Sequence, residues 1–325
     1  MHELQQSESW KLLAYSNSDD ILFDVALELK DIQDVSIDES ITTVKKVIES
    51  YHLKHQESCA DLDRVTYELV IHLTQPYRIP FMTSRMDAVL PLLRGCDSKS
   101  AILDYGGGGG KDSIIYAKLG FAVTYSDLLN REFTELVTKR FKLRALPVEC
   151  VDVRDIGPRR FDIINCMDVV EHVYDVERIT ADIVSRMTPG GLLFMYPSFC
   201  NSWNGDHVEK NCGYVGIYEA MLQAVGLRII SREPLLCCVR ERPFIGDLIY
   251  EREVFQYELY QISKKLAMQT ARKSAFRLPV ALMKAHYISC ASEQQLRYEQ
   301  LLSPVIDCLA IWRLSSHRLC SRDGV

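Results

Sequence analysis

The chain lacks any apolar run long enough to cross a bilayer, and its first residues show no basic-then-apolar signal pattern. It also lacks a basic surplus: the formal net charge is −6 at pH 7. An acidic balance argues against nucleic acid as the main partner. Internal repeats and low-complexity linkers are missing as well. These absences predict a globular protein of 325 residues with no membrane span.

The cysteines are not spaced as the ligands of a metal site are. The chain has 11 of them, none arranged as Cys-x-x-Cys, and Cys237-Cys238 is the one close pair. Zinc sites of the common kinds need two such spaced pairs or a matching set of histidines. An odd number of cysteines without that spacing predicts buried, reduced thiols and a cytoplasmic location.

Glycine is scarce, with 16 residues in the chain, yet five stand consecutively at Gly106–Gly110 between a strand-like and a helix-like segment. Glycines after a strand allow a sharp turn and a close approach of the backbone to a ligand. A phosphate-binding P-loop ending at Lys111 would need glycine at Tyr105 and a hydroxyl at Asp112. The dinucleotide pattern G-x-G-x-x-G fails too, because its third glycine would fall on Lys111 or Asp112.

The pattern that fits is an acid, one residue, and then G-x-G-x-G, formed by Asp104, Gly106, Gly108 and Gly110. It resembles motif I of the class I S-adenosylmethionine (SAM)-dependent methyltransferases. The resemblance implies a doubly wound, Rossmann-like α/β fold, with a seven-stranded, mostly parallel sheet and an antiparallel edge strand. It also implies SAM as methyl donor and S-adenosylhomocysteine (SAH) as product.

Four later segments follow the order of that family. A second strand ends in Asp127, whose carboxylate is placed to accept from both ribose hydroxyls. A third strand ends in Asp152, which matches the residue that meets the adenine amino group. A fourth strand runs into Asp168–Val173, similar to the family's "EHV" segment, and Met187–Pro197 resembles its "PGG" turn and fifth strand. The cofactor-binding residues that the resemblance implies are Asp104, Gly106, Gly108, Gly110, Asp127, Leu128, Asp152, Val153, Met167 and Arg85.

The strand and helix patterns divide the chain into three parts. Residues 1–98 are predicted to be helical, residues 99–242 to form the SAM-binding core, and residues 243–325 to form a C-terminal helical extension. In the first part, a helix capped by Asp19 or Asp20 and another after Ser40 are expected, then helices over 58–74 and 82–94. In the second, a helix is expected over 212–225, and residues 227–231 and 234–239 as the closing strand pair.

Residues 60–94 are the best candidate for a lid over the cofactor, as N-terminal helices of this family commonly provide. Tyr77, Arg78 and Arg85 could then reach the cofactor's carboxylate or the substrate. The alternative is that these arginines are ordinary surface residues.

Two histidines are candidate general bases, because an imidazole titrates near working pH. His172 follows the fourth strand, and His207 lies in the segment that lines the acceptor pocket in the family. The alternative for His172 is a structural role at the start of a helix. The polar and aromatic residues that could line the acceptor pocket are Tyr196, Ser198, Trp203, Tyr214 and Tyr218.

Asp168, Glu171, His172 and His207 together resemble the metal site of the ubiquinone-pathway O-methyltransferases and of the small-RNA 2′-O-methyltransferases. The departure is Asp168, where those families carry glutamate. Metal-free relatives share the Glu-His pair, so the prediction assigns no metal ligand.

The sequence therefore predicts a methyltransferase that moves a methyl group from SAM to an O, N or C atom of a small, biosynthetic acceptor. The alternatives are a metal-assisted O-methyltransferase of the two kinds just named, an RNA or protein methyltransferase, and a catalytically silent SAM-binding subunit. The helical flanks would suit docking to a partner or to a second copy of the chain. A NAD-dependent oxidoreductase is disfavoured by the missing third glycine.

Overall fold

The computed structural model describes residues 7–240, except 17, 19, 54–58, 60–61, 79, 128–130, 200–206, 215–217, 225 and 233–234. The predicted C-terminal extension, residues 243–325, lies outside the described residues. The chain divides into two compact units. The described residues of unit 1 fall within 7–167, 191–195 and 231–237, and those of unit 2 within 168–190, 196–230 and 238–240. The predicted domain boundaries at 98 and 242 stay predictions.

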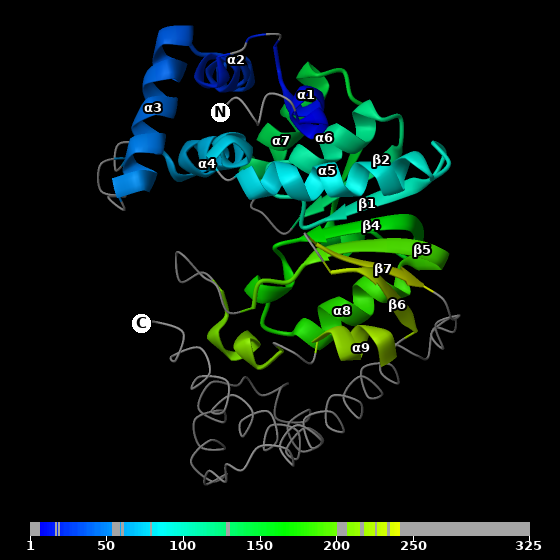
Figure 1. Ribbon diagram of the computed structural model, residues 1–325. Helices are drawn as coiled ribbons and strands as arrows, with labels where there is room; N and C mark the ends of the chain where they lie inside the picture. Colours follow the sequence, from blue (N-terminus) through cyan, green and yellow to red (C-terminus); the bar gives the residue numbers. More distant parts are fainter. Residues whose placement is uncertain are drawn as a thin grey trace, which may run out of the picture. The chain divides into compact units, whose positions relative to one another are not determined.

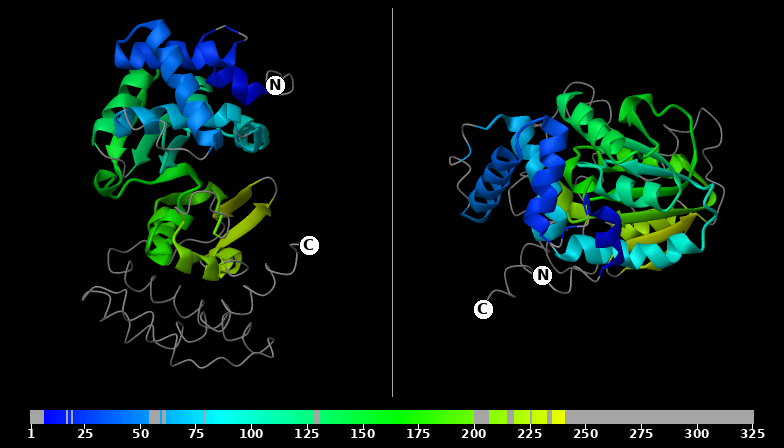
Figure 2. Two further views of the ribbon diagram at one scale, coloured as in Figure 1. Left: turned by 90° about the vertical axis from the view of Figure 1, so that its left-hand side faces the viewer. Right: turned by 90° about the horizontal axis from the view of Figure 1, so that it is seen from above.

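Unit 1 begins with the helices α1 (Glu8–Leu13), α2 (Ile21–Gln33), α3 (Ile37–Leu53), α4 (Arg64–Arg78) and α5 (Pro80–Arg94). Asp20 caps α2 as predicted, because its carboxylate accepts from the backbone N–H groups of Leu22 and Phe23 at 2.9 and 3.2 Å. The helices α2, α3 and α4 lie beside one another and pack in part on α7 (Arg131–Leu143) (Figures 1 and 2).

Several predicted helix boundaries were wrong. Helix α4 begins at Arg64 instead of 58, and α5 begins at Pro80 instead of 82. Helix α4 runs through Pro76 to Arg78 instead of ending at 74. A proline near the end of a helix removes a single backbone donor, so the last turn survives. Helix α3 begins at Ile37, before Ser40, since the Ser36 hydroxyl accepts from the Glu39 N–H at 3.2 Å and caps the helix earlier.

A seven-stranded sheet has the order β3-β2-β1-β4-β5-β7-β6. Its strands are β1 (Ala101–Tyr105), β2 (Ala122–Asp127), β3 (Val148–Asp152), β4 (Phe161–Met167), β5 (Met187–Tyr196), β6 (Leu227–Ser231) and β7 (Leu236–Arg240). The pairs β1–β2, β2–β3 and β1–β4 are parallel, and the edge is antiparallel. This confirms the predicted fold class. The chain order reverses at β1, next to β4, and ligands of such sheets bind outside the carboxyl ends of the strands at that point.

Short helices connect the strands. In unit 1, α6 (Lys111–Lys118) packs on β1, β2 and β3, and η3 (Val153–Asp155) follows β3. Unit 2 holds η4 (Val170–His172), α8 (Val176–Ser185), η5 (Glu209–Tyr214) and α9 (Tyr218–Ala224). The single helix predicted over 212–225 is thus two shorter elements. In the part of the chain that the structure describes, none of the helices combines the length and apolar character needed to traverse a bilayer.

Candidate cofactor and catalytic sites

The glycine loop between β1 and α6 is held by hydrogen bonds along its length. The N–H groups of Gly106 and Gly107 donate to the Ser126 carbonyl at 2.8 and 3.2 Å. The Gly108 N–H donates to Asp127 Oδ2 at 2.7 Å, and the Tyr125 hydroxyl donates to the Gly108 carbonyl at 2.7 Å. Strand β2 therefore supplies most of the partners that set the shape of the loop.

Glycine is required at two positions of this loop. Gly110 has φ +76°, and a Cβ there would lie 2.5 Å from Phe141 Cζ. A Cβ at Gly107 would lie 2.7 Å from Asp104 Oδ2. Real Cβ atoms do not approach other atoms so closely, so both positions exclude a side chain.

Asp104 supports the loop from inside the protein. Its side chain is buried, and its oxygens accept from the Ser113 hydroxyl at 2.6 Å and from Asn165 Nδ2 at 2.8 Å. Burial, and then the neighbouring charge of Asp112, raises the pKa of Asp104 to about 6. These bonds tie β1 to α6 and β4. Direct contact of Asp104 with a cofactor stays a prediction.

The two acids predicted to hold adenosine line one cavity of about 620 Å³ beside α7. Asp127 ends β2 and is half-buried. Asp152 ends β3, and Arg154 bonds both of its oxygens, at 2.8 and 2.6 Å. This pairing holds the pKa of Asp152 at about 2, so the carboxylate is charged at neutral pH. Arg131, Lys139 and Lys142 line the same cavity.

The other predicted cofactor residues are placed as follows. Val153 begins η3 and is half-buried, and Met167 ends β4 with 9% of its surface exposed. Arg85 lies in α5 and is buried, so it is not an ordinary surface residue. Leu128 lies outside the described residues, as do the side chains of Tyr77 and Arg78. Contact of each with a cofactor stays a prediction.

His72 lies against the glycine loop, and the sequence did not single it out. An added Cβ at Gly109 would lie 2.6 Å from His72 Cβ, and one at Gly108 would lie 3.1 Å from His72 Cε1. The imidazole also packs edge-on against Phe133, with ring centroids 5.3 Å apart. The available signal was weak: His72 falls in the segment predicted as a lid, but nothing in its neighbours marks it.

Unit 2 brings three of the four predicted metal-ligand candidates together. Each of Glu171, His172 and His207 offers one ligand atom, and these three atoms lie within 4.8 Å of one another. The His172 and His207 rings meet edge-on, with centroids 4.7 Å apart. Asp168 is not in this cluster of described residues. It has a φ of +53°, in the left-handed region.

Glu171 has the donor chemistry of a cation ligand. Its side chain is fully buried. Oε1 accepts from the Ser198 N–H at 3.1 Å, and Oε2 has no hydrogen-bond partner among the described residues. Burial, with a further contribution from the charge of Asp168, raises the pKa of Glu171 to about 7. A buried carboxylate oxygen beside two imidazoles suits a divalent cation, which would compensate the buried charge.

The predicted acceptor-pocket residues are only partly described. Tyr214 and Tyr218 are buried and pack with Phe199, whose ring centroid lies 5.5 and 5.1 Å from theirs. The Tyr218 hydroxyl is 2.9 Å from that of Thr180. These contacts are those of core residues. Trp203 lies outside the described residues.

Comparisons with known proteins agree with the geometry. Residues 77–236 match a protein-family model described as a methyltransferase domain. The ubiquinone biosynthesis O-methyltransferase of Coxiella burnetii (strain RSA 493 / Nine Mile phase I) is 30% identical over 128 residues, which are 38% of this chain and 50% of that protein. The enzyme of the same name from Xanthomonas euvesicatoria pv. vesicatoria is 33% identical over 134 residues, with the same shares. The chain spans about half the length of these curated relatives.

Among solved structures, the magnesium protoporphyrin IX methyltransferase of Synechocystis PCC 6803 with bound SAM is similar at 19% identity. The similarity covers 55% of this chain and 85% of that one, with a TM-score of 0.37.

Residues 77–236 are a methyltransferase domain of the class I SAM-dependent superfamily, as the glycine loop predicted. SAM is the methyl donor of this class of domain, so the predicted cofactor is confirmed at that level.

Proposed function

We propose that the whole chain is a SAM-dependent methyltransferase that acts on an O, N or C atom of a small-molecule acceptor. The observation that carries the proposal is the glycine loop at the reversal of the sheet, with the Asp127 carboxylate held beside it by the Gly108 N–H at 2.7 Å. The names of the two ubiquinone-pathway relatives support a biosynthetic acceptor.

The residues of the chain fit SAM at this loop. When bound, the cofactor would supply a methyl group activated by its bond to a sulfonium; the acceptor atom would bond to the methyl carbon in line with that C–S bond, which breaks to leave SAH. Asp127 would accept from the ribose hydroxyls, and Asp152 from the adenine amino group. Gly107 and Gly110 leave no room for a side chain, and the backbone of the loop would lie close to the cofactor.

The donor class is tested by calorimetry on the full chain. We expect SAH and SAM to bind with micromolar dissociation constants, and NAD to show no heat of binding. A chain that binds NAD but neither SAM nor SAH would overturn the proposal. Methyl incorporation from labelled SAM without an added protein partner then separates an enzyme from a silent binding subunit.

A second candidate is a metal-assisted O-methyltransferase, favoured by the cluster of Glu171, His172 and His207. A divalent ion there would lower the pKa of an acceptor hydroxyl. We expect Mg²⁺ or Mn²⁺ to bind the chelator-treated wild type in calorimetry, and Glu171→Gln to abolish that binding. SAH affinity should stay within about twofold in the variant. Equal metal binding by Glu171→Gln and wild type would remove this candidate and return His172 and His207 to candidate general bases.

The cellular location also stays a proposal. The described cysteines, Cys59, Cys96, Cys150, Cys166, Cys237 and Cys238, are free thiols. This agrees with the cytoplasm predicted from their spacing.

A further inference from the structure

The Gly109 carbonyl of the glycine loop is bound by a buried arginine of α7. Arg140 Nη1 donates to it at 2.5 Å. The Arg140 side chain is 2% exposed. A charged donor in a buried setting makes a stronger and more directional bond than a neutral one. Arg140 is therefore placed to fix the orientation of the Gly109 peptide, one residue after the Gly108 N–H that Asp127 binds.

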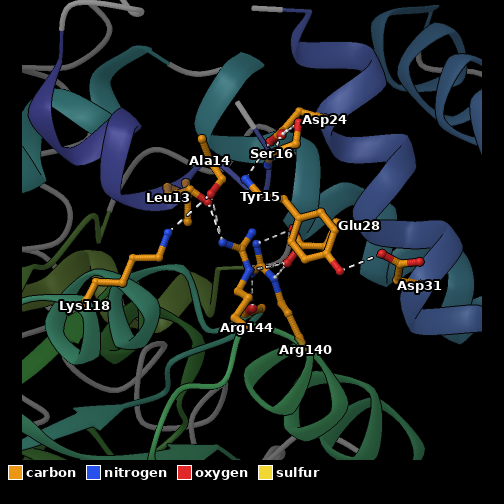
Figure 3. A network of polar contacts seen from close by, with 11 residues as sticks. Leu13, Ala14, Tyr15, Ser16, Asp24, Glu28, Asp31, Lys118, Arg140 and Arg144 are labelled. Carbon is orange, nitrogen blue, oxygen red and sulfur yellow. Dashed lines mark hydrogen bonds and ion pairs between the residues drawn. The ribbon is translucent and has the colours of Figure 1, made fainter. Parts of the chain in front are cut away.

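Arg140 is itself held by Glu28 of α2. Its Nε and Nη2 donate to the two carboxylate oxygens of Glu28 at 2.8 and 3.0 Å, and Glu28 is 3% exposed at the side chain. A bidentate pair fixes the plane of the guanidinium. The pairing of Glu28 with Arg140 is shown in Figure 3. The direction in which Nη1 donates to the Gly109 carbonyl is thus set by a residue of the N-terminal helices.

A second arginine shares the same carboxylate. Arg144 Nε donates to Glu28 Oε1 at 2.6 Å, and its Nη1 donates to the carbonyls of Leu13 and Ala14, at the end of α1, at 2.9 and 3.2 Å. Arg144 also lies over the Tyr15 ring, 5.0 Å from its centroid. Two buried cations thus share one anion, and each also donates to the protein backbone (Figure 3). The carbonyls that Arg144 binds lie at the end of α1, and the carbonyl that Arg140 binds lies in the glycine loop.

We propose that Arg140 is a positioning residue for the cofactor: it holds the Gly109 peptide in the shape that binds SAM, and Glu28 of α2 holds Arg140. This rests on the proposed binding of SAM at the glycine loop. Glu28 lies outside the matched domain, residues 77–236. Cofactor affinity then depends on an N-terminal helix that the domain itself does not include.

The arginine pair offers a matched experiment. In Arg140→Gln and in Arg144→Gln, Glu28 keeps one buried arginine partner, so each variant retains a balanced ion pair. The loop contact is lost in the first alone. We expect the SAH dissociation constant of Arg140→Gln to rise about tenfold and that of Arg144→Gln to change by less than about twofold. Thermal midpoints are measured in both.

Calorimetry separates positioning from folding. A purely structural role would lower the binding stoichiometry, because fewer molecules are folded, and would leave the dissociation constant of the folded fraction unchanged. If Arg140→Gln does not fold, the measurement passes to Arg140→Lys, which keeps the charge but cannot reach Glu28 and Gly109 with one planar group. Unchanged affinity in a folded Arg140 variant, or equal losses in the two arginine variants, overturns the inference. If the wild type binds no SAH, the proposed function fails, and this inference fails with it.

Discussion

Replacing Asp127 by alanine should weaken SAM and SAH binding by at least about 100-fold, since hydrogen bonds to a charged acceptor are worth about 1.5–3 kcal/mol each. The change removes the proposed acceptor of the ribose hydroxyls and also the oxygen that holds the Gly108 N–H at 2.7 Å. Asp127→Asn, which keeps the shape and one acceptor oxygen, should lose less affinity for SAM and SAH. Calorimetry on folded protein gives both dissociation constants.

The matched control for this prediction is Asp155→Ala. Asp155 is an exposed acid on η3, so its loss changes the net charge equally and should leave the affinity within about twofold. A folded Asp127→Ala protein that binds SAH within threefold of the wild type would show that β2 does not end at the ribose site.

Replacing Glu28 by glutamine should lower the stability of the fold by roughly 3–5 kcal/mol. Arg140 and Arg144 would then be buried cations without a counter-charge, although the amide can still accept a hydrogen bond. The measurement is denaturant unfolding at neutral pH. Glu68→Gln is the control, because its partner Arg64 is 87% exposed at the side chain and such pairs contribute about 0–1 kcal/mol.

The ion pairs of Glu28 with Arg140 and Arg144 also predict how the free energy of unfolding changes at acidic pH. Burial alone would raise the pKa of Glu28, but Arg140 and Arg144 outweigh it and lower the pKa from 4.5 to about 2. A depressed folded-state pKa means that the stabilisation is complete above about pH 4.5 and is lost as the pH falls toward 2. The variant should lose this part of the pH dependence. If wild type and Glu28→Gln lost the same stability as the pH falls, Glu28 would not be the group responsible for the loss.

The class of fold and the cofactor loop were open to prediction because both depend on local chemistry. Gly106–Gly110 fall between a buried strand and a helix, and acids end the next two strands at Asp127 and Asp152. A turn with positive φ and a strand that ends in a carboxylate leave direct marks on residue type. Helix ends were less predictable: Pro76, near the end of α4, removes a single backbone donor, and Ser36 caps α3 ahead of Ser40.

What the sequence by itself determined is the methyltransferase class, the order of the strands along the chain and the glycine loop that follows the first of them. Tertiary structure decided the rest. It joined Glu28 to Arg140 across 112 positions of sequence, placed His72 on the glycines, and gathered Glu171 with His207 while leaving Asp168 out of that cluster. The reason is physical: an ion pair or a cluster between distant segments depends on how helices pack against one another. Hydrophobic periodicity shows which face of a helix is buried, but it does not show which distant residue that face meets.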